Sequence, residues 1–445
     1  MARKRARQRL QQLDPVRVTI DSLSHDGRGV ATVEGKKIFV EDALPQEQVT
    51  FRYVESRRSY DVGRAEAILT ASPQRVEPRC SAFGRCGGCV LQHLKPAAQI
   101  DFKQQQLLSN LTRIGKVAAV EVAPPLLGPQ WGYRHKARLG VRYVKARERV
   151  MIGFRERRSS FIADIDHCPV LHPSVAEQLP ALAELIGSLD SFDRIAQLEV
   201  AVDESQTALV VRHLDPLSER DLQRLTDYAI SHSLALYLQP KGPDSMTPLW
   251  PQTVVLKYQL PQFGVSYQFE PSDFTQVNPA INRLMVTQAL DWLELQPQQR
   301  VLDLFCGLGN FTLALATQVA EVVGVEGSEL LVERARENSA LNRLDNVTFY
   351  AADLGGDNLA QQPWWQQRFD KVLLDPSRSG ADRVLPHLAA MGVTTLLYVS
   401  CNPATLARDA GELVNRFGYR LQRVGVLDMF PHTAHVESMA LFVKV

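Results

Sequence analysis

The chain has 445 residues, of which 45% are hydrophobic, which is enough for two to four packed domains and argues against disorder. No apolar run reaches the roughly 18 residues needed to span a bilayer, and the basic N-terminus lacks the apolar core of a secretory signal, so we expect a cytoplasmic protein. The net charge of +1 conceals an asymmetry, because residues 265–445 hold 14 basic and 20 acidic side chains and the remainder holds 36 and 29. A basic N-terminal part and an acidic C-terminal part predict that the N-terminal part binds a polyanion.

The first 72 residues contain two segments of different character. Residues 1–14 carry five basic side chains and form either an arm on nucleic acid or a solvated terminus. Residues 15–72 alternate four or five short strand-like runs with turns, which predicts a small closed β-barrel of the OB type. The stretch D-G-R-G-V-A at 26–31 resembles part of a TRAM domain, and this resemblance implies that the barrel binds RNA.

Three cysteines follow within ten residues. They are Cys80, Cys86 and Cys89, with glycines between them that let the backbone wrap closely around a bound centre. Cys168 is the fourth soft ligand that such a centre needs. Four thiolates suit zinc or an iron–sulfur cluster, and the spacing alone does not choose between the two. Three close cysteines with one remote, followed by Pro169, favour a [4Fe–4S] cluster.

Basic residues are densest between Tyr133 and Arg158, where ten arginines and lysines stand against two glutamates. Strand alternation places Arg138 and Arg142 on one face, which makes this segment the strongest candidate for a phosphate-contacting surface. Helical and strand-like runs alternate over residues 170–260. We therefore expect residues 73–264 to form a central α/β domain that carries the four cysteines.

Residues 265–445 repeat strand–helix units, which is typical of a doubly wound, Rossmann-like parallel sheet. The first strand, 301–305, leads into the glycine loop C-G-L-G-N at 306–310. Glu326 ends the next strand, where a carboxylate accepts both ribose hydroxyls, and Asp353 ends the one after it, near an adenine. This order indicates an S-adenosylmethionine (SAM) methyltransferase domain more than a dinucleotide-binding one, because the G-x-G-x-x-G fingerprint is absent.

A further strand in this domain ends at a cysteine. The apolar run 394–399 predicts a buried strand that stops at S-C-N-P (400–403), and a helix-like stretch follows. Cys401 therefore lies at the edge of the sheet where ligands bind. Its thiol is a candidate nucleophile. The alternative interpretation is that Cys401 is only a small apolar residue packed in the core.

Five stretches of the C-terminal domain resemble the family of RNA uracil-C5 methyltransferases, which make 5-methyluridine. They are F-T-Q-V-N (274–278), D-L-F-C-G-L-G-N-F (303–311), D-P-S-R (375–378), S-C-N-P (400–403) and H-V-E-S (435–438). With the barrel and the cysteines, the resemblance extends over nearly the whole chain and favours family members that act on 23S rRNA. It implies an enzyme that uses SAM and binds RNA, and we expect it to be a monomer.

The resemblance also implies roles for individual residues. Cys401 would attack C6 of uracil, which gives C5 the carbanion character it needs to take the methyl group, and Glu437 would then remove the C5 proton. The cofactor site would consist of Gln276, Phe305, Asn310, Glu326, Asp353 and Asp375. Three alternatives stay open: the same chemistry on tRNA or on another rRNA uridine, a cytosine-C5 methyltransferase, which would pair two cysteines, and a non-catalytic RNA-binding protein with an iron–sulfur cluster.

Overall fold

The computed structural model describes residues 14–356 and 358–445, so the predicted basic tail lies outside the described residues except for Asp14. The chain divides into two compact units. The first unit contains the residues up to Lys103 together with Gly153–Ile165 and Phe430–His435, and the second contains Gln104–Ile152, Asp166–Met429 and Val436–Val445. None of the described helices is both long and apolar enough to cross a lipid bilayer.

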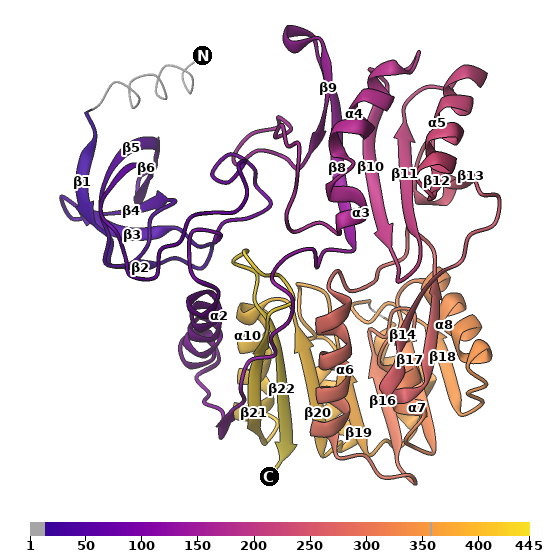
Figure 1. The fold of residues 1–445 in the computed structure, drawn as a ribbon. Helices are drawn as coiled ribbons and strands as arrows, with labels where there is room; N and C mark the ends of the chain where they lie inside the picture. Colours follow the sequence, from indigo (N-terminus) through magenta and orange to yellow (C-terminus); the bar gives the residue numbers. More distant parts are fainter. Residues whose placement is uncertain (1–13, 357) are drawn as a thin grey trace. The chain divides into compact units, whose positions relative to one another are not determined.

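A six-stranded barrel forms most of the first unit (Figure 1). Its strands are β1 (Val16–Thr19), β2 (Ser22–Leu23), β3 (Gly29–Val33), β4 (Lys36–Glu41), β5 (Gln48–Ser56) and β6 (Tyr60–Thr70), in the sheet order β1-β5-β6-β4-β3-β2. Strands β1 and β2 lie at opposite edges of this sheet although they are consecutive in the chain. The sheet therefore has to curl into a barrel. The predicted barrel is confirmed, and the sequence missed only the two-residue strand β2.

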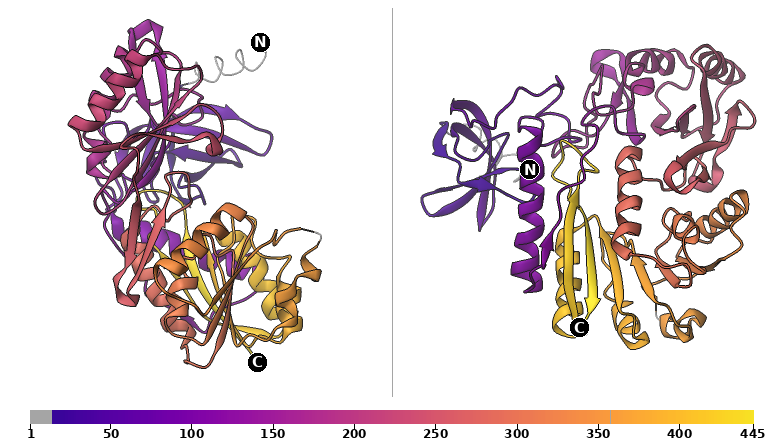
Figure 2. Two further views of the ribbon diagram at one scale, coloured as in Figure 1. Left: turned by 90° about the vertical axis from the view of Figure 1, so that its right-hand side faces the viewer. Right: turned by 60° about the horizontal axis from the view of Figure 1, so that its bottom comes forward.

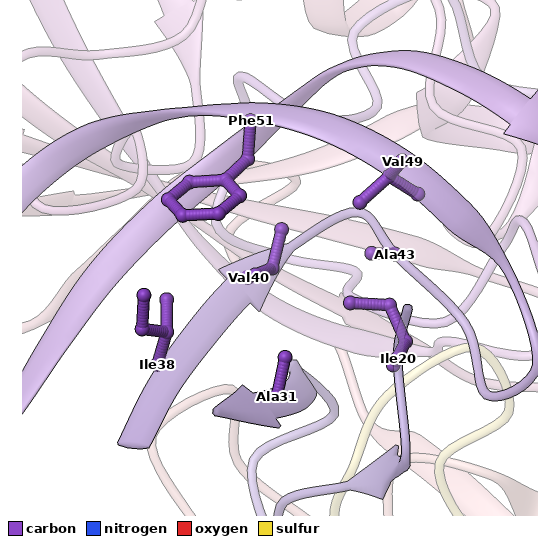
Figure 3. Close-up of a cluster of buried hydrophobic side chains, with 7 residues drawn as sticks. All are labelled: Ile20, Ala31, Ile38, Val40, Ala43, Val49 and Phe51. Atoms are coloured by element: carbon purple, nitrogen blue, oxygen red, sulfur yellow. The ribbon is translucent and has the colours of Figure 1, made fainter. Parts of the chain in front are cut away.

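The barrel is closed around a small apolar core (Figure 3), which consists of Ile20, Ala31, Ile38, Val40, Ala43, Val49 and Phe51. The Phe51 ring is fully buried, and a Cβ atom on Gly63 of the neighbouring strand β6 would lie 2.3 Å from it. Glycine is therefore the residue at position 63 that lets the two strands pair across this ring.

The second unit begins with a mixed sheet that corresponds to the predicted central α/β region. Its strands are β8 (Lys136–Val144), β9 (Arg149–Gly153), β10 (Ile195–Val202), β11 (Thr207–His213), β12 (Leu234–Gln239) and β13 (Thr247–Trp250), in the order β13-β12-β11-β10-β8-β9. Three helices accompany it: α3 (Pro173–Ala176), α4 (Leu179–Ser188) and α5 (Glu219–Ser231). The hairpin of β14 (Leu256–Leu260) and β15 (Val265–Phe269) follows this sheet in the chain.

An eight-stranded sheet forms the rest of the second unit, in the order β18-β17-β16-β19-β20-β22-β21-β7. Its strands are β16 (Arg300–Leu304), β17 (Glu321–Glu326), β18 (Val347–Ala351), β19 (Lys371–Leu374), β20 (Thr395–Ser400), β21 (Tyr419–Leu427), β22 (Glu437–Lys444) and the short β7 (Glu121–Val122). Strands β16 to β20 are parallel to one another, and β22 runs antiparallel between β20 and β21. The predicted doubly wound sheet is confirmed, with one reversed strand that the sequence pattern did not specify.

Helices cover both faces of this sheet, with α6 on one face and α10 on the other (Figures 1 and 2). The helices are α6 (Pro279–Leu293), α7 (Thr312–Ala316), α8 (Glu329–Leu341), α9 (Leu385–Met391) and α10 (Pro403–Asn415). Helix α2 (Pro96–Asn110) begins in the residues of the first unit and ends in those of the second. Because both faces are covered, the central strands are buried almost throughout, which explains their continuous apolar runs.

Asparagine and proline fix where the helices begin at the carboxyl edge of this sheet. The Asn402 side chain accepts from the Ala404 N–H at 3.1 Å, and Pro403 occupies the first helical position of α10. Asn278 and Pro279 do the same for α6. A capping oxygen followed by proline is favourable at a helix start, so strand β20 stops abruptly and leaves Cys401 in the connection.

Candidate active site

The carboxyl ends of the parallel strands gather most of the predicted site residues at one edge of the eight-stranded sheet. Phe305 and Asn310 follow β16, Glu326 ends β17, Asp353 follows β18, Asp375 follows β19 and Cys401 follows β20. Ligands bind at this edge in open α/β sheets. The predicted residues thus come together because parallel pairing aligns the ends of five separate strands.

The register of β20 against β22 brings Cys401 opposite Glu437. Ser400 pairs with Ser438 in this antiparallel ladder, so the next residues outward on the two strands are Cys401 and Glu437. The Ser438 hydroxyl donates to the Ser400 carbonyl at 3.2 Å, which ties the two strand ends together. The candidate nucleophile and the candidate base therefore face one position at the edge of the sheet.

The surroundings of both groups disfavour their ionised forms in the ligand-free site. Burial raises the pKa of the Cys401 thiol to about 11, and the charges of Glu437 and Asp375 act in the same direction. Glu437 is only 4% exposed, and burial followed by the charge of Asp375 raises its pKa well above the ordinary value. Arg378 lowers both pKa values. The arrangement therefore places a thiol and a carboxyl group together in surroundings that disfavour both ionised forms.

The loops that carry Arg378 and Cys401 are joined directly. The Asn402 side-chain amide donates to the Arg378 carbonyl at 3.0 Å. The D-P-S-R and S-C-N-P stretches are therefore one structural feature, although 21 residues separate Arg378 from Ser400 in the chain.

Two more carboxyl groups, Asp375 and Asp303, lie at this edge, and Asp303 was not among the predicted site residues. Burial and the charge of Glu326 raise the pKa of Asp375 to about 7. Asp303 is fully buried, and its pKa is raised to about 8 by burial first and then by Asp375 and Glu326. The Thr312 hydroxyl donates to Asp303 Oδ2 at 2.6 Å, while Oδ1 has no hydrogen-bond partner. The sequence signal for Asp303 is a carboxylate between apolar residues of strand β16.

The glycine loop after β16 has the backbone conformations that a close approach to a ligand requires. Gly307 and Gly309 have φ angles of +56° and +95°, and Phe305 has +66°. The Glu326 carboxylate accepts from the Gly307 N–H at 3.1 Å and from the Ser328 N–H at 3.0 Å. Left-handed conformations of non-glycine residues are uncommon and cluster at functional sites. The left-handed Phe305 therefore indicates that this turn belongs to a binding site.

Asn310, at the end of the glycine loop, is held by a network that the sequence did not reveal. Its side chain exchanges two hydrogen bonds of 2.9 Å with Asn282 of α6, and its Oδ1 also accepts from the Tyr258 hydroxyl at 3.0 Å. The Tyr267 hydroxyl donates to the Asn310 carbonyl at 3.0 Å. The two tyrosine rings stack at 4.5 Å on the β14–β15 hairpin. No sequence motif predicts these hydrogen-bond partners of Asn310, because they come from distant parts of the chain.

Gln276 differs in position from the other predicted cofactor residues. It lines a cavity of about 750 Å³ together with Asn278 and Asn282, and none of the other five predicted cofactor residues lines that cavity. Asn282 connects the two regions because it also bonds Asn310.

The predicted metal site has no support in the described residues. Nowhere in them do three or more His, Cys, Asp or Glu side chains gather so that they could hold a metal ion. Cys80, Cys86 and Cys89 belong to the first unit and Cys168 to the second. Within the first unit, the Gly88 N–H donates to Cys86 Sγ at 3.4 Å, and burial raises the pKa of Cys86.

The predicted alternation on β8 is confirmed. Arg138 and Arg142 are exposed, whereas Leu139 and Val141 between them are buried. Arg138 forms an ion pair with Glu199 at 3.2 Å. This strand therefore presents basic side chains on its outer face.

Comparison with known proteins agrees with this geometry. Residues 133–445 match the model of the tRNA (uracil-5-)-methyltransferase family, and residues 14–66 match that of the TRAM domain. The 23S rRNA (uracil(1939)-C(5))-methyltransferases RlmD of Hahella chejuensis and Nitrosococcus oceani are 52% and 51% identical to the chain. The two alignments cover 99% and 96% of both partners.

A solved structure is also similar over nearly the whole length. The crystal structure of Pyrococcus abyssi tRNA (uracil-54, C5)-methyltransferase in complex with S-adenosyl-L-homocysteine superposes with a TM-score of 0.74 at 26% identity. The match covers 96% of this chain and 100% of the other. The fold and the strand-end site thus define a Rossmann-like methyltransferase with an N-terminal TRAM barrel. The chain belongs to the RNA (uracil-5-)-methyltransferase family.

Proposed function

We propose that the protein methylates C5 of one uridine in 23S rRNA, using SAM as the methyl donor. The observation that carries this proposal is the opposition of Cys401 and Glu437 at the carboxyl edge of the sheet. The choice of 23S rRNA follows relatives that are about half identical over their full length and carry that activity in their names. We further propose the equivalent of uridine 1939 as the target, action in the cytoplasm and a monomeric state.

Six residues would hold the cofactor: Gln276, Phe305, Asn310, Glu326, Asp353 and Asp375. Glu326 would accept the ribose hydroxyls and Asp353 would lie near the adenine, as expected for carboxylates on successive strand ends. The similar P. abyssi enzyme was solved with S-adenosyl-L-homocysteine, which is the product form of SAM. SAM supplies an electrophilic methyl group, and the protein has to supply the nucleophile.

The residues of the chain would do this in three steps. The Cys401 thiolate adds to C6 of the target uracil, which moves the electron pair of the C5–C6 bond to C5 and O4. C5 then forms a bond to the methyl carbon as that carbon leaves the sulfur of SAM. Glu437 removes the proton from C5, the double bond re-forms and the thiolate is expelled. The target base must leave its stack to reach Cys401.

Methyl transfer from labelled SAM to rRNA that lacks the modification tests this function. The wild type should label the RNA in 5-methyluridine, and Cys401→Ala should reduce turnover below detection. Tyr228→Phe is a matched control, because Tyr228 donates a hydrogen bond to Gln178 on the central α/β region. Normal turnover by Cys401→Ala would overturn the mechanism.

The same chemistry on tRNA is a second candidate, because the similar solved structure is a tRNA enzyme. Mapping 5-methyluridine in rRNA and tRNA from a deletion strain separates the two substrates. Loss of the modification from 23S rRNA alone supports the rRNA proposal, and loss from tRNA alone excludes it. Methylated cytosine in either RNA would favour the cytosine-C5 alternative.

We also propose, from the cysteine spacing alone, that Cys80, Cys86, Cys89 and Cys168 bind a [4Fe–4S] cluster. No step of the reaction depends on it. Protein purified without oxygen should be brown and absorb at about 400 nm. Colourless protein with one equivalent of zinc would exclude the cluster. The domain boundaries proposed with it are 15–72 for the barrel, 73–264 for the central domain and 265–445 for the methyltransferase domain.

A further inference from the structure

Residues 378–381 form a turn whose backbone is tied to helix α10. The Asn402 cap of the helix bonds the carbonyl of the first residue of this 378–381 turn. The Arg408 guanidinium donates to the carbonyl of the second residue at 2.9 Å. The Asp409 carboxylate accepts from the Ala381 N–H, at the end of the turn, at 2.8 Å. The helix that follows Cys401 therefore holds the turn at three points.

Asp409 is the fully buried centre of this connection. Its Oδ2 also accepts from the Tyr398 hydroxyl at 2.7 Å, and its Oδ1 accepts from Arg408 Nε at 2.8 Å. Burial and then the charge of Asp409 raise the pKa of Tyr398, so the hydroxyl keeps the proton that it donates. Tyr398 lies on β20, three residues before Cys401. One carboxylate thus joins the strand before Cys401, the helix after it and the 378–381 turn.

Gly380 shows how closely the turn approaches this carboxylate. Its φ angle is +85°, and a Cβ atom there would lie 2.5 Å from Arg408 Nη2 and 2.7 Å from Asp409 Oδ2. Glycine is therefore required both by the backbone conformation and by the space. Replacing a buried ion pair by apolar residues is often neutral or stabilising, so stability alone does not explain a buried carboxylate at this place.

The position of the Arg378 charge depends on the backbone of the turn. Arg378 is exposed, and among the described residues its side chain forms no hydrogen bond or ion pair. Asp375 precedes the turn and is anchored separately, because its N–H donates to the Leu304 carbonyl of β16 at 3.3 Å. Movement of the turn would therefore displace Arg378 and leave Asp375 at the edge of the sheet.

We propose that Asp409 is a positioning residue, which fixes the 378–381 turn so that the Arg378 guanidinium stays close to Cys401 and Glu437. The inference rests on the proposed function, in which these two groups are the nucleophile and the base. Burial and then the carboxyl groups of Glu437 and Asp375 disfavour the Cys401 thiolate, and burial and then Asp375 disfavour the ionised Glu437. Arg378 favours both ionised forms, so its displacement would raise the pKa of both groups.

The first test measures the reactivity of the Cys401 thiol, which requires neither RNA nor SAM. The rate constant for alkylation by iodoacetamide is followed against pH, and mass spectrometry of the peptide that contains Cys401 separates it from the other cysteines. Asp409→Asn keeps the shape of the side chain and removes its charge. It should slow alkylation about threefold or more at neutral pH, because the rate follows the thiolate fraction. The difference should shrink as the pH approaches the pKa of the thiol.

A double variant shows whether Asp409 acts through Arg378. Arg378→Ala should slow alkylation in the same direction, and Asp409→Asn/Arg378→Ala should be little slower than Arg378→Ala alone. Turnover should follow the same rule. Asp409→Asn should displace the pH profile of kcat/KM to higher pH and reduce kcat/KM about fivefold or more at pH 7, with little further loss in the double variant.

Asp221→Asn is the matched control. Asp221 is also fully buried on a helix, α5, and it accepts from the Asp190 and Ser191 N–H groups at 2.6 and 3.1 Å. This variant should lower the melting temperature and keep the wild-type pH dependences. Arg408→Ala is the second variant if Asp409→Asn does not fold. It removes the bonds of Arg408 to the turn and to Asp409 from a side chain that is 41% exposed, and it should shift both pH dependences in the same direction.

Two results would overturn the inference. In the first, the variant lowers the melting temperature but leaves alkylation and the pH profile of kcat/KM as in wild type, which would assign Asp409 a structural role alone. In the second, the variant slows alkylation by the same factor with and without Arg378, so that Asp409 does not act through it. Failure of the proposed function looks different, because wild type would then not methylate the RNA while the alkylation rates would still test Asp409.

Discussion

The protonation states of Cys401 and Glu437 are the central problem at the scale of single residues. The proposed reaction needs a thiolate and a carboxylate, whereas burial raises the pKa of both groups in the ligand-free site. Since kcat/KM reports on the free enzyme, it should rise with pH through the neutral and alkaline range. Arg378 opposes burial at both groups, which makes it the residue that tunes this pH dependence.

Replacing Arg378 by alanine should therefore displace the pH profile of kcat/KM to higher pH. Without the positive charge both pKa values rise, so a smaller fraction of the enzyme is correctly ionised at any pH below them. The expected loss is several-fold at pH 7 and shrinks as the pH increases. Arg378→Lys, which keeps the charge, should stay close to the wild-type profile. An equal loss at every pH would mean that Arg378 acts on RNA binding instead.

Replacing Glu437 by glutamine should separate the first two chemical steps from the last. Glutamine cannot take the C5 proton, so the methylated adduct between Cys401 and the RNA should accumulate. Turnover should fall about 10²- to 10⁴-fold, the usual contribution of a general base. Denaturing gels of enzyme with labelled SAM and RNA should show a slowly migrating labelled band. The double variant Cys401→Ala/Glu437→Gln should lack this band, and a band in that variant would refute the assignment of the nucleophile.

At the scale of elements, the sequence predicted strand ends well and contacts between elements poorly. Apolar runs bounded by polar residues identify β16, β17 and β20 because both faces of those strands are buried. Their parallel pairing then assembles Glu326, Asp375 and Cys401 without further information. The opposition of Cys401 and Glu437 depends on the antiparallel register of β22, which no local pattern specifies. The hydrogen bonds from Tyr258 and Tyr267 to Asn310 depend on how the β14–β15 hairpin packs, which a single sequence does not show either.

The β14–β15 hairpin should act as a support for the cofactor loop. Tyr258→Phe and Tyr267→Phe each remove one hydroxyl that bonds Asn310. One such hydrogen bond contributes about 0.5–1.5 kcal/mol, so each variant should weaken binding of S-adenosyl-L-homocysteine by about 2- to 12-fold. Isothermal titration calorimetry measures this change, and kcat at saturating SAM should change little.

Two comparisons make the hairpin prediction specific. Tyr228→Phe should bind S-adenosyl-L-homocysteine like wild type, because the Tyr228 hydroxyl donates to Gln178 and not to Asn310. Asn310→Ala should weaken binding at least as much as either tyrosine variant. If Asn310→Ala matters and both tyrosine variants bind normally, the hairpin is not a support for this loop.

At the scale of the whole molecule, composition predicted a folded protein of several domains. It did not show whether the four cysteines come together. The barrel over residues 16–70 and the methyltransferase sheet are each built from local patterns, so both were predictable from the sequence. A four-cysteine site is not local, because Cys168 is 79 residues from Cys89 and belongs to a different compact unit. Cysteine spacing can suggest which residues bind a metal, but only the fold or a bound metal centre brings them together.

The uneven charge of the chain predicts how RNA binding depends on salt. Arg138 and Arg142 lie exposed on the outer face of β8, in the basic part of the sequence. If both contact phosphates, replacing both by alanine removes up to two released counterions, so the slope of log KM for RNA against log salt should flatten by about 1–2. KM for SAM should not change. The matched control is Arg212→Ala/Arg220→Ala, two exposed arginines of the same unit, whose salt slope should equal that of wild type. A wild-type slope in the Arg138/Arg142 variant, or the same flattening in the control, would mean that β8 does not contact the RNA backbone.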